Sequence, residues 1–121
     1  MHTIIPGMLA RDGKVVMPYG VMGGHYQSYG HMQFLTRMID FEKDIQVAQD
    51  MPRIFPEPTE GHVEYESSVP QSTVAGLREL GHKMVPAASP LGGSQAVSID
   101  WREGVLTGGS DPRKDGCAIG Y

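Results

Sequence analysis

Two adjacent glycines, Gly23 and Gly24, stand where the sequence changes from a strand-like to a helix-like pattern, in PYGVMGGHYQSYGHMQFLTRMID (18–40). Glycine adopts positive φ angles and allows other atoms to approach the backbone closely. The N–H groups just before a helix have no partner within it and lie at the positive end of its dipole. They could therefore bind an anion, or an oxygen that becomes negative during a reaction. Spacing alone favours a simple turn, because a lone Gly-Gly is weak evidence for a ligand.

The other residues that could carry chemistry form no recognisable site. His25 and His31 are six residues apart and so lie on different helical faces, which argues against a metal pair. His62 and His82 stand in strand-like or turn-like sequence, without Cys or carboxylate partners at ligand spacing. Cys117 has no obvious base nearby and is expected to be a small buried residue rather than a nucleophile. No Ser-His-Asp spacing, Walker loop or G-x-G-x-x-G motif is present.

Composition excludes several classes of protein. The 121 residues suffice for one domain at most, or a part of one, and 40% hydrophobic with 20% charged residues is ordinary for a globular chain. A net charge of −4 argues against nucleic-acid binding, and no apolar run is long enough to span a membrane. The single cysteine excludes an internal disulfide and leaves the compartment open. The start does not read as a signal peptide, so the cytoplasm is favoured slightly over export.

The order of strand-like and helix-like segments predicts an α+β fold, with helices packed on a mainly antiparallel sheet. Asp12-Gly13 and Glu103-Gly104 each separate two β-rich runs, which predicts two hairpins. Pro6 and Pro18 would interrupt a ladder, so the first hairpin should be bulged or lie partly at a sheet edge. The expected strands are 3–10, 14–22, 62–67, 82–87, 95–101 and 105–110, and the expected helices are 26–40, 42–53 and 70–80, with a Pro-rich passage at 55–61.

Helical spacing also predicts which side chains are buried. In the first helix the apolar stripe consists of Met32, Leu35, Met38 and Ile39. In the third helix the inward residues are expected to be Val74, Leu77 and Leu80. Asp44 and Ser68 are candidate N-caps of the second and third helices, Pro52 closes the second, and Gly81 ends the third.

Five segments carry a resemblance: HTIIP (2–6), MPYGVMGG (17–24), DMPR (50–53), PLGGSQAVSID (90–100) and GVLTGGSDPRKDGCAIGY (104–121). In this order and with these gaps they resemble the C-terminal part of the gamma-glutamyltranspeptidase family. The resemblance covers essentially the whole chain, 1–121, and its closing segment is quite specific. The HTIIP form is similar to a divergent bacterial branch of that family.

The resemblance implies an N-terminal-nucleophile hydrolase fold, an αββα sandwich of two sheets between helix layers, of which this chain would be a portion. It implies a precursor that cuts itself and frees a threonine, which attacks a γ-glutamyl amide such as glutathione with its own amine as base. Water, an amino acid or a peptide then releases the acyl group, and no metal or organic cofactor is implied. Gly23 and Gly24 match the family's oxyanion hole, and His2 and Thr3 align with a serine pair that binds the substrate's α-carboxylate.

Two departures from the family pattern leave alternatives open. His2 does not match the serine, so the acyl specificity could differ, as in a related amide acylase. The family's threonine nucleophile lies upstream of HTIIP, and Thr3 occupies the carboxylate-binding position instead. We therefore expect the chain alone to be inactive and to need the upstream large-subunit and small-subunit segments as partners. The alternative is a non-catalytic truncated module that self-associates as a homo-oligomer.

Overall fold

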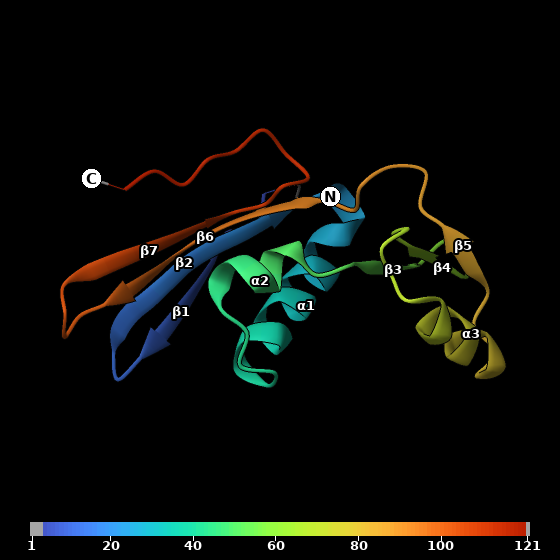
Figure 1. Ribbon diagram of the computed structural model, residues 1–121, viewed down its shortest axis with the longest axis horizontal. Helices are drawn as coiled ribbons and strands as arrows, with labels where there is room; N and C mark the ends of the chain where they lie inside the picture. The colour runs from blue at the N-terminus through green and yellow to red at the C-terminus, as the bar shows by residue number, and fades with distance from the viewer. Residues whose placement is uncertain (1–3, 121) are drawn as a thin grey trace. The chain divides into compact units, whose positions relative to one another are not determined.

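The computed structural model describes residues 4–120, and these form two compact units (Figure 1). The first unit combines the chain up to Met51 with the chain from Gly92 onward, and the second spans Pro52–Leu91. His2 and Thr3, the predicted carboxylate-binding pair, lie outside the described residues. Within the described part, no helix is long and apolar enough to cross a membrane.

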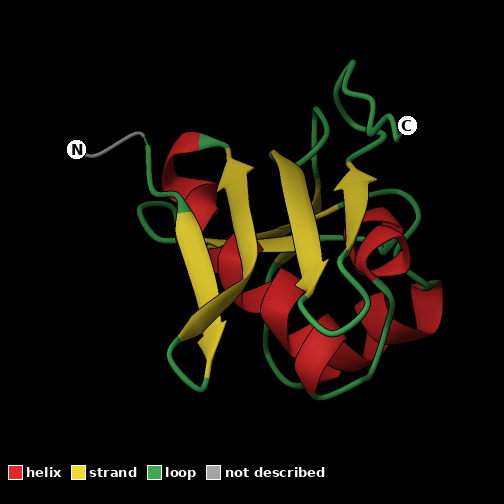
Figure 2. Ribbon diagram, turned by 90° about the vertical axis from the view of Figure 1, so that its left-hand side faces the viewer, coloured by secondary structure: helices red, strands yellow, loops and turns green. Residues whose placement is uncertain are grey.

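The first unit is built on an antiparallel sheet with the strand order β1-β2-β6-β7, whose strands lie side by side in Figure 2. The strands are β1 (Gly7–Arg11), β2 (Lys14–Met22), β6 (Gly93–Asp100) and β7 (Val105–Ser110). Both predicted hairpins are confirmed. Asp12 and Gly13 have φ angles of 51° and 75°, as a type I′ turn requires, and Gly104 has φ 68°.

The expected irregularity of the first hairpin is also confirmed. A register shift falls between Leu9 and Ala10, and β1 is an edge strand. Pro18 pairs with Met8 of β1, and pairing between β2 and β6 begins only at Tyr19. The missing N–H of Pro18 therefore falls where β2 has a single neighbour.

Two helices cover one face of this sheet (Figure 1). A short 3₁₀ helix, η1 (Gly24–Tyr26), leads into α1 (Gln27–Ile39), and α2 (Ile45–Asp50) follows. The predicted N-cap of α2 is confirmed, because the Asp44 carboxylate accepts from the N–H groups of Gln46 and Val47. The shared core of sheet and helices comprises Met17, Phe34, Ile45, Ala48 and Ala96.

The predicted stripe of α1 is only half right. Leu35 and Met38 pack against the core, but Met32 and Ile39 are 53% and 57% exposed. The buried face follows Gly30, Phe34 and Arg37 instead. Arg37 occupies a buried position because its guanidinium donates to the carbonyl oxygens of Ala48 and Met51. A pattern of apolar residues cannot predict a buried cation whose charge is satisfied by backbone carbonyl groups.

The second unit is a three-stranded sheet, β3-β4-β5, with one helix, α3 (Gln71–Glu79). Strands β4 (His62–Tyr65) and β5 (Met84–Pro86) match the predicted segments and pair in parallel. Strand β3 (Ile54–Glu57) was predicted as part of a Pro-rich connection. Pro56 is tolerated there because β3 is an edge strand.

The predicted ends of α3 need one correction. The N-cap is Pro70 rather than Ser68, and it makes no side-chain cap bond. Val74 and Leu77 pack in the core, but Leu80 is 78% exposed because it stands at the C-cap, past the inward face. Gly81, with φ 92°, ends the helix as expected.

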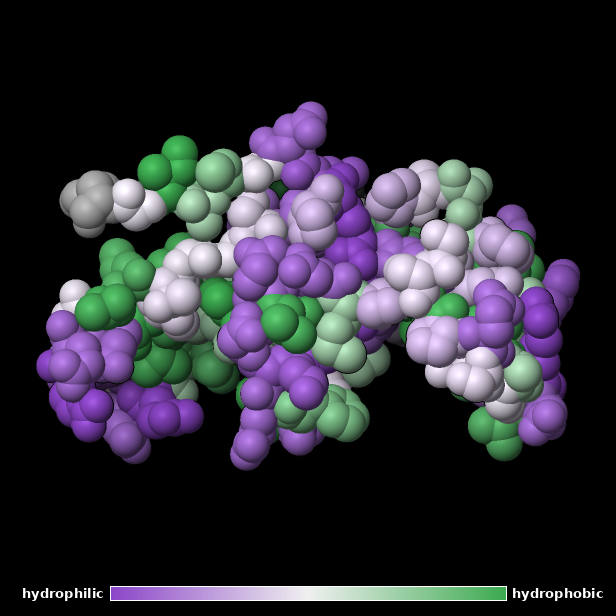
Figure 3. All heavy atoms as spheres, in the orientation of Figure 1, coloured by the Kyte–Doolittle hydropathy of each residue, from purple (hydrophilic) through white to green (hydrophobic). Residues whose placement is uncertain are grey.

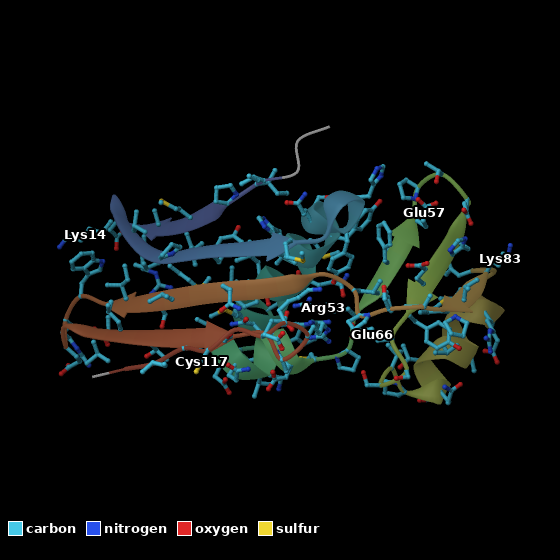
Figure 4. The ribbon with its side chains drawn as sticks, turned by 90° about the horizontal axis from the view of Figure 1, so that it is seen from above. Lys14, Arg53, Glu57, Glu66, Lys83 and Cys117 are labelled. Carbon is cyan, nitrogen blue, oxygen red and sulfur yellow. The ribbon has the colours of Figure 1, made fainter. Side chains whose placement is uncertain are left out.

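A buried arginine fixes the two ends of the second unit. Arg53, which is 2% exposed, donates to the carbonyl oxygen of Leu91 at 2.8 Å. The Glu66 carboxylate accepts from the backbone N–H groups of both residues, at 2.9 and 3.1 Å (Figure 4). These charge-assisted bonds hold the entry and exit of the unit at one carboxylate.

Cys117 is exposed, contrary to the prediction that it is buried (Figure 4). The reason is an alternation in the segment after β7. A Cβ at Gly116 would contact Gln95 and Ser110, and Ala118 contacts Gly108. The side chain between these two inward positions therefore points away from the sheet.

Candidate functional site

The diglycine forms the turn between β2 and the helices. Gly23 has φ 134° and is the N-cap of η1, and Gly24 has φ 60°. L-residues rarely adopt such angles, so glycine is required on conformational grounds alone. The carbonyl oxygen of Gly23 accepts from the N–H of Tyr26, at 3.1 Å. The carbonyl of Gly24 accepts from the N–H and from Nε2 of Gln27.

The two N–H groups of the diglycine behave differently from its carbonyls. Among the residues that the structure describes, neither the N–H of Gly23 nor that of Gly24 donates a hydrogen bond. Both residues are exposed, and both N–H groups precede a helical turn that runs directly into α1. Backbone donors at such a position are available to an anion or to a developing oxyanion.

A groove of about 310 Å³ flanks the diglycine. Met22 and Gln27, which stand on either side of Gly23-Gly24, both line it. The remaining wall is largely apolar and includes Ile4, Ile5 and Pro6, with Gln95 as a second amide. Ile4 and Ile5 directly follow Thr3 in the chain. The groove is thus lined by chain neighbours of both pairs that the sequence predicted: the diglycine and the carboxylate-binding pair His2-Thr3.

Part of the groove wall belongs to the face of the sheet that carries no helix, although Val21 and Gln27 of α1 also line it. Successive strand residues point to opposite faces, and Met17, Val21 and Ala96 face the helices. Their neighbours Met22 and Gln95 therefore point to the other side, into the groove. Exposed apolar side chains on this helix-free face are Met8, Met22, Val97 and Leu106. Figure 3, which views the sheet from its side, shows hydrophobic residues gathered along the strands of the first unit.

A buried polar network anchors the start of β6, next to the groove. Asp111 is fully buried, and its Oδ2 accepts from the N–H and the hydroxyl of Ser94, at 2.8 and 2.9 Å. The hydroxyl of Ser94 also contacts Oε1 of Gln49 at 3.0 Å. Arg113 pairs with Asp111 at 3.2 Å and donates to the carbonyl oxygens of Gln49 and Met51. The sequence predicted no role for these residues, although GGSDPR belongs to the closing segment, which is quite specific for the resemblance.

The histidines do not join the site as ligands. His25 and His82 are exposed. His62 lies 3.5 Å from Glu60 and 3.8 Å from Glu64, so it does have carboxylate neighbours, contrary to the sequence reading. Glu64 is a neighbour because residues two apart on β4 share a face, and Glu60 lies in the turn just before that strand. Within residues 4–120, no group of three or more His, Cys, Asp or Glu side chains could hold a metal ion.

His31 has a structural role: it binds the backbone of β2 just before the diglycine. Pairing of β2 with β1 ends at Tyr19, so the N–H of Val21 lies beyond the end of β1. Nε2 of His31 accepts from that N–H at 3.1 Å, and the ring packs against Tyr19 in a tilted arrangement, with centroids 5.0 Å apart. Burial lowers the pKa of His31, which favours the neutral ring that can accept this bond.

Comparison with known proteins decides the family. The family model for gamma-glutamyltranspeptidase matches residues 1–121. The chain belongs to the gamma-glutamyltranspeptidase family. A glutathione hydrolase-like proenzyme (YwrD) of Bacillus subtilis is 35% identical over 98% of the chain, which spans 24% of that relative's length. The chain thus spans about a quarter of a gamma-glutamyltranspeptidase-family precursor.

Solved structures confirm the fold class. A cephalosporin acylase from Bacillus halodurans is 38% identical and matches 99% of the chain with a TM-score of 0.89, over 23% of its own length. A gamma-glutamyltranspeptidase from Pseudomonas nitroreducens, complexed with L-DON, matches the whole chain and 63% of its own, with a TM-score of 0.89 at 22% identity. The chain therefore has a portion of the N-terminal-nucleophile hydrolase fold, with helices packed on mainly antiparallel sheet.

The bond between His31 and Val21 predicts a pH dependence of stability. As pH falls, the unfolded chain takes up a proton at the ordinary pKa of 6.5, before the folded protein does. The contribution of His31 is therefore fully present above that value and is lost as pH falls through the window below it. We expect urea unfolding to show a drop in stability as pH falls below about 6.5 that His31→Gln lacks. Equal pH dependence in both proteins would contradict this role.

Proposed function

We propose that this chain is part of a larger amide hydrolase or acyltransferase, and that the N–H groups of Gly23 and Gly24 form its oxyanion hole. One observation carries the proposal. The carbonyl oxygens of the diglycine are hydrogen-bonded, whereas its N–H groups have no acceptor among the described residues and lie beside a groove. Donors arranged in advance around a developing negative charge are among the largest contributors to catalysis of acyl transfer.

The missing part of the enzyme is proposed to cover the helix-free face of the sheet. That face exposes apolar residues, of which Leu106 is 67% and Met8 is 71% exposed. A sheet needs a second layer to bury such a face. The chain also spans only about a quarter of its curated relative. Both observations support an upstream segment, which packs on this face and supplies the nucleophile.

The proposed reaction divides the work between the two segments. A threonine hydroxyl from the upstream segment adds to the substrate's amide carbon, and its proton passes to the threonine's own amine. The carbonyl oxygen becomes negative and is held by the N–H groups of Gly23 and Gly24. The C–N bond then breaks, the amine leaves with a proton, and an acyl-enzyme remains. Water or an acceptor amine releases the acyl group. His2 and Thr3 are proposed to bind the substrate's α-carboxylate.

The oxyanion role can be tested at Gly24 in the intact enzyme. A Cβ at this position meets no atom within 4 Å, so Gly24→Ala adds backbone strain but keeps the N–H. Gly24→Pro removes the N–H as well, and it also forces φ from 60° to about −65°. We expect kcat for γ-glutamyl amide cleavage to fall by about 100-fold or more in Gly24→Pro and by no more than about tenfold in Gly24→Ala. Similar losses in both would assign the effect to strain, and an active Gly24→Pro would remove the assignment.

A second candidate function keeps this mechanism and changes the acyl group. The groove wall is apolar along Ile4, Ile5 and Pro6, which suits a methylene chain better than the charged α-amino group of a glutamyl substrate. His2 replaces the first serine of the carboxylate-binding pair, and the 38% identical structure is that of a cephalosporin acylase. These observations favour a dicarboxylic acyl group without an amino substituent.

A substrate panel separates the two acyl classes. If the second candidate is right, kcat/KM for glutaryl or adipyl amides exceeds that for the matching γ-glutamyl amide by about tenfold or more. The physical reason is the cost of leaving an ammonium group against an apolar wall. A clear preference for glutathione in the same assay would eliminate this candidate and retain the glutamyl one.

The open face also predicts how the chain behaves when expressed alone. Without an upstream layer, the exposed apolar side chains should drive self-association, so that size-exclusion elution shifts with protein concentration. Leu106→Glu should weaken this association because it places a charge on the helix-free face. Leu80→Glu is the matched control, since Leu80 is also exposed but belongs to the second unit. A strictly monomeric wild-type chain would contradict the prediction.

A further inference from the structure

Three glycines surround one buried aromatic ring behind the diglycine. Tyr26 is 2% exposed. A Cβ on Gly30 would lie 2.8 Å from Cε1 of the ring, and a Cβ on Gly92 would lie 2.7 Å from Cδ1. A Cβ on Gly23 would lie 3.3 Å from the Cβ of Tyr26. The ring therefore occupies the space into which side chains at these three positions would extend. Gly23 belongs to the candidate oxyanion turn, and Gly92 lies against it.

Gly92 makes the closest of these approaches. A Cβ at this position would overlap the carbonyl oxygen of Met22, which is backbone and has no rotamer to change. Gly92 and Gly23 also face each other directly, since a Cβ on Gly23 would lie 3.1 Å from the Cα of Gly92. The Met22 carbonyl and the Gly23 N–H belong to one planar peptide, so a displaced oxygen moves the N–H with it.

The position of Gly92 is itself fixed. Gly93 pairs with Met22 and Ser94 pairs with Val21 in the ladder between β6 and β2. Ser94 is bonded through its N–H and hydroxyl to the fully buried carboxylate of Asp111. The backbone of Ser94 also accepts from the N–H of Asp111, at 3.1 Å. Residue 92 therefore cannot withdraw from Met22 without breaking buried, charge-assisted bonds.

We propose that Gly92 and Tyr26 are positioning residues for the oxyanion hole: together they set where the N–H of the Met22–Gly23 peptide points. This inference rests on the proposed function of the diglycine. Tyr26 supports the turn from the helix side, and the bare Cα of Gly92 permits the turn to approach β6. Neither residue needs to touch the substrate. Misplacing a donor by a fraction of an ångström lowers the rate without removing the binding site.

The test compares two glycines with nearly the same positive φ angle in the intact, self-processed enzyme. Gly92 has φ 66° and Gly104 has φ 68°, but a Cβ at Gly104 meets nothing within 4 Å. Gly92→Ala and Gly104→Ala thus share the backbone strain, and only the first adds the clash. We expect Gly92→Ala to lower kcat by about 10- to 100-fold with KM within about threefold, and Gly104→Ala to keep both values.

The outcomes separate this inference from the proposed function. If Gly24→Pro loses activity while Gly92→Ala keeps kcat within about threefold, the positioning role is overturned and the oxyanion hole stands. If Gly24→Pro is as active as the wild type, the oxyanion hole and the positioning role fail together. Equal losses of kcat in Gly92→Ala and Gly104→Ala would overturn the positioning role, because strain alone would then explain them.

A second pair of variants is used if the Gly92→Ala enzyme fails to fold or to cleave itself into its active form. Tyr26→Leu removes the ring without adding an atom against Met22. Tyr65→Leu is its control, because Tyr65 is a buried tyrosine of the second unit and is 7% exposed. Both changes should lower thermal stability. Only Tyr26→Leu should lower kcat, by about tenfold at constant KM, at a temperature where both enzymes are folded. Unchanged kcat in Tyr26→Leu would overturn the inference.

Discussion

In the first unit, two stretches of backbone approach so closely that neither can carry a side chain at the point of contact. Gly92 lies against the Met22 carbonyl and Gly23, and Tyr26 closes the space behind them. This contact fixes the turn between β2 and η1, whose neighbours Met22 and Gln27 line the groove. Conformational freedom of glycine is therefore only part of the explanation. The lack of a Cβ atom at Gly23 and Gly92 matters as much as their positive φ angles, because it allows the close contact.

The parts of the fold that local chemistry dictates could be predicted from the sequence. The Asp12-Gly13 turn, the Asp44 cap and the Gly81 stop each depend on residues within a few positions of one another. The errors have long-range causes. Met32 was assigned to the buried face of α1, yet Arg37 takes such a place because carbonyl groups of the following helix and its C-terminal end accept from it. No periodicity of apolar residues reveals such acceptors.

In the candidate site, too, the features set by local sequence were predicted and those set by long-range contacts were not. The diglycine was identified from its own sequence context, and the availability of its N–H groups agrees with the role proposed for it. The groove was not predicted, because Ile4, Gln27 and Gln95 come together only when the sheet forms. The role of Asp111 was missed for the same reason, although the closing segment to which it belongs is quite specific for the resemblance. A motif indicates that a residue has a role. The residues that it contacts, which explain the role, are known only from the folded structure.

The tail after β7 has a practical consequence. Gly116 and Ala118 contact the helix-free face of the sheet, and the thiol of Cys117 between them points outward. As this is the single cysteine in the sequence, a fluorophore attached to it would be uniquely located. It would lie on the strip of chain that runs along the uncovered face. Its emission would therefore report the arrival of a second layer directly, in real time and independently of any substrate.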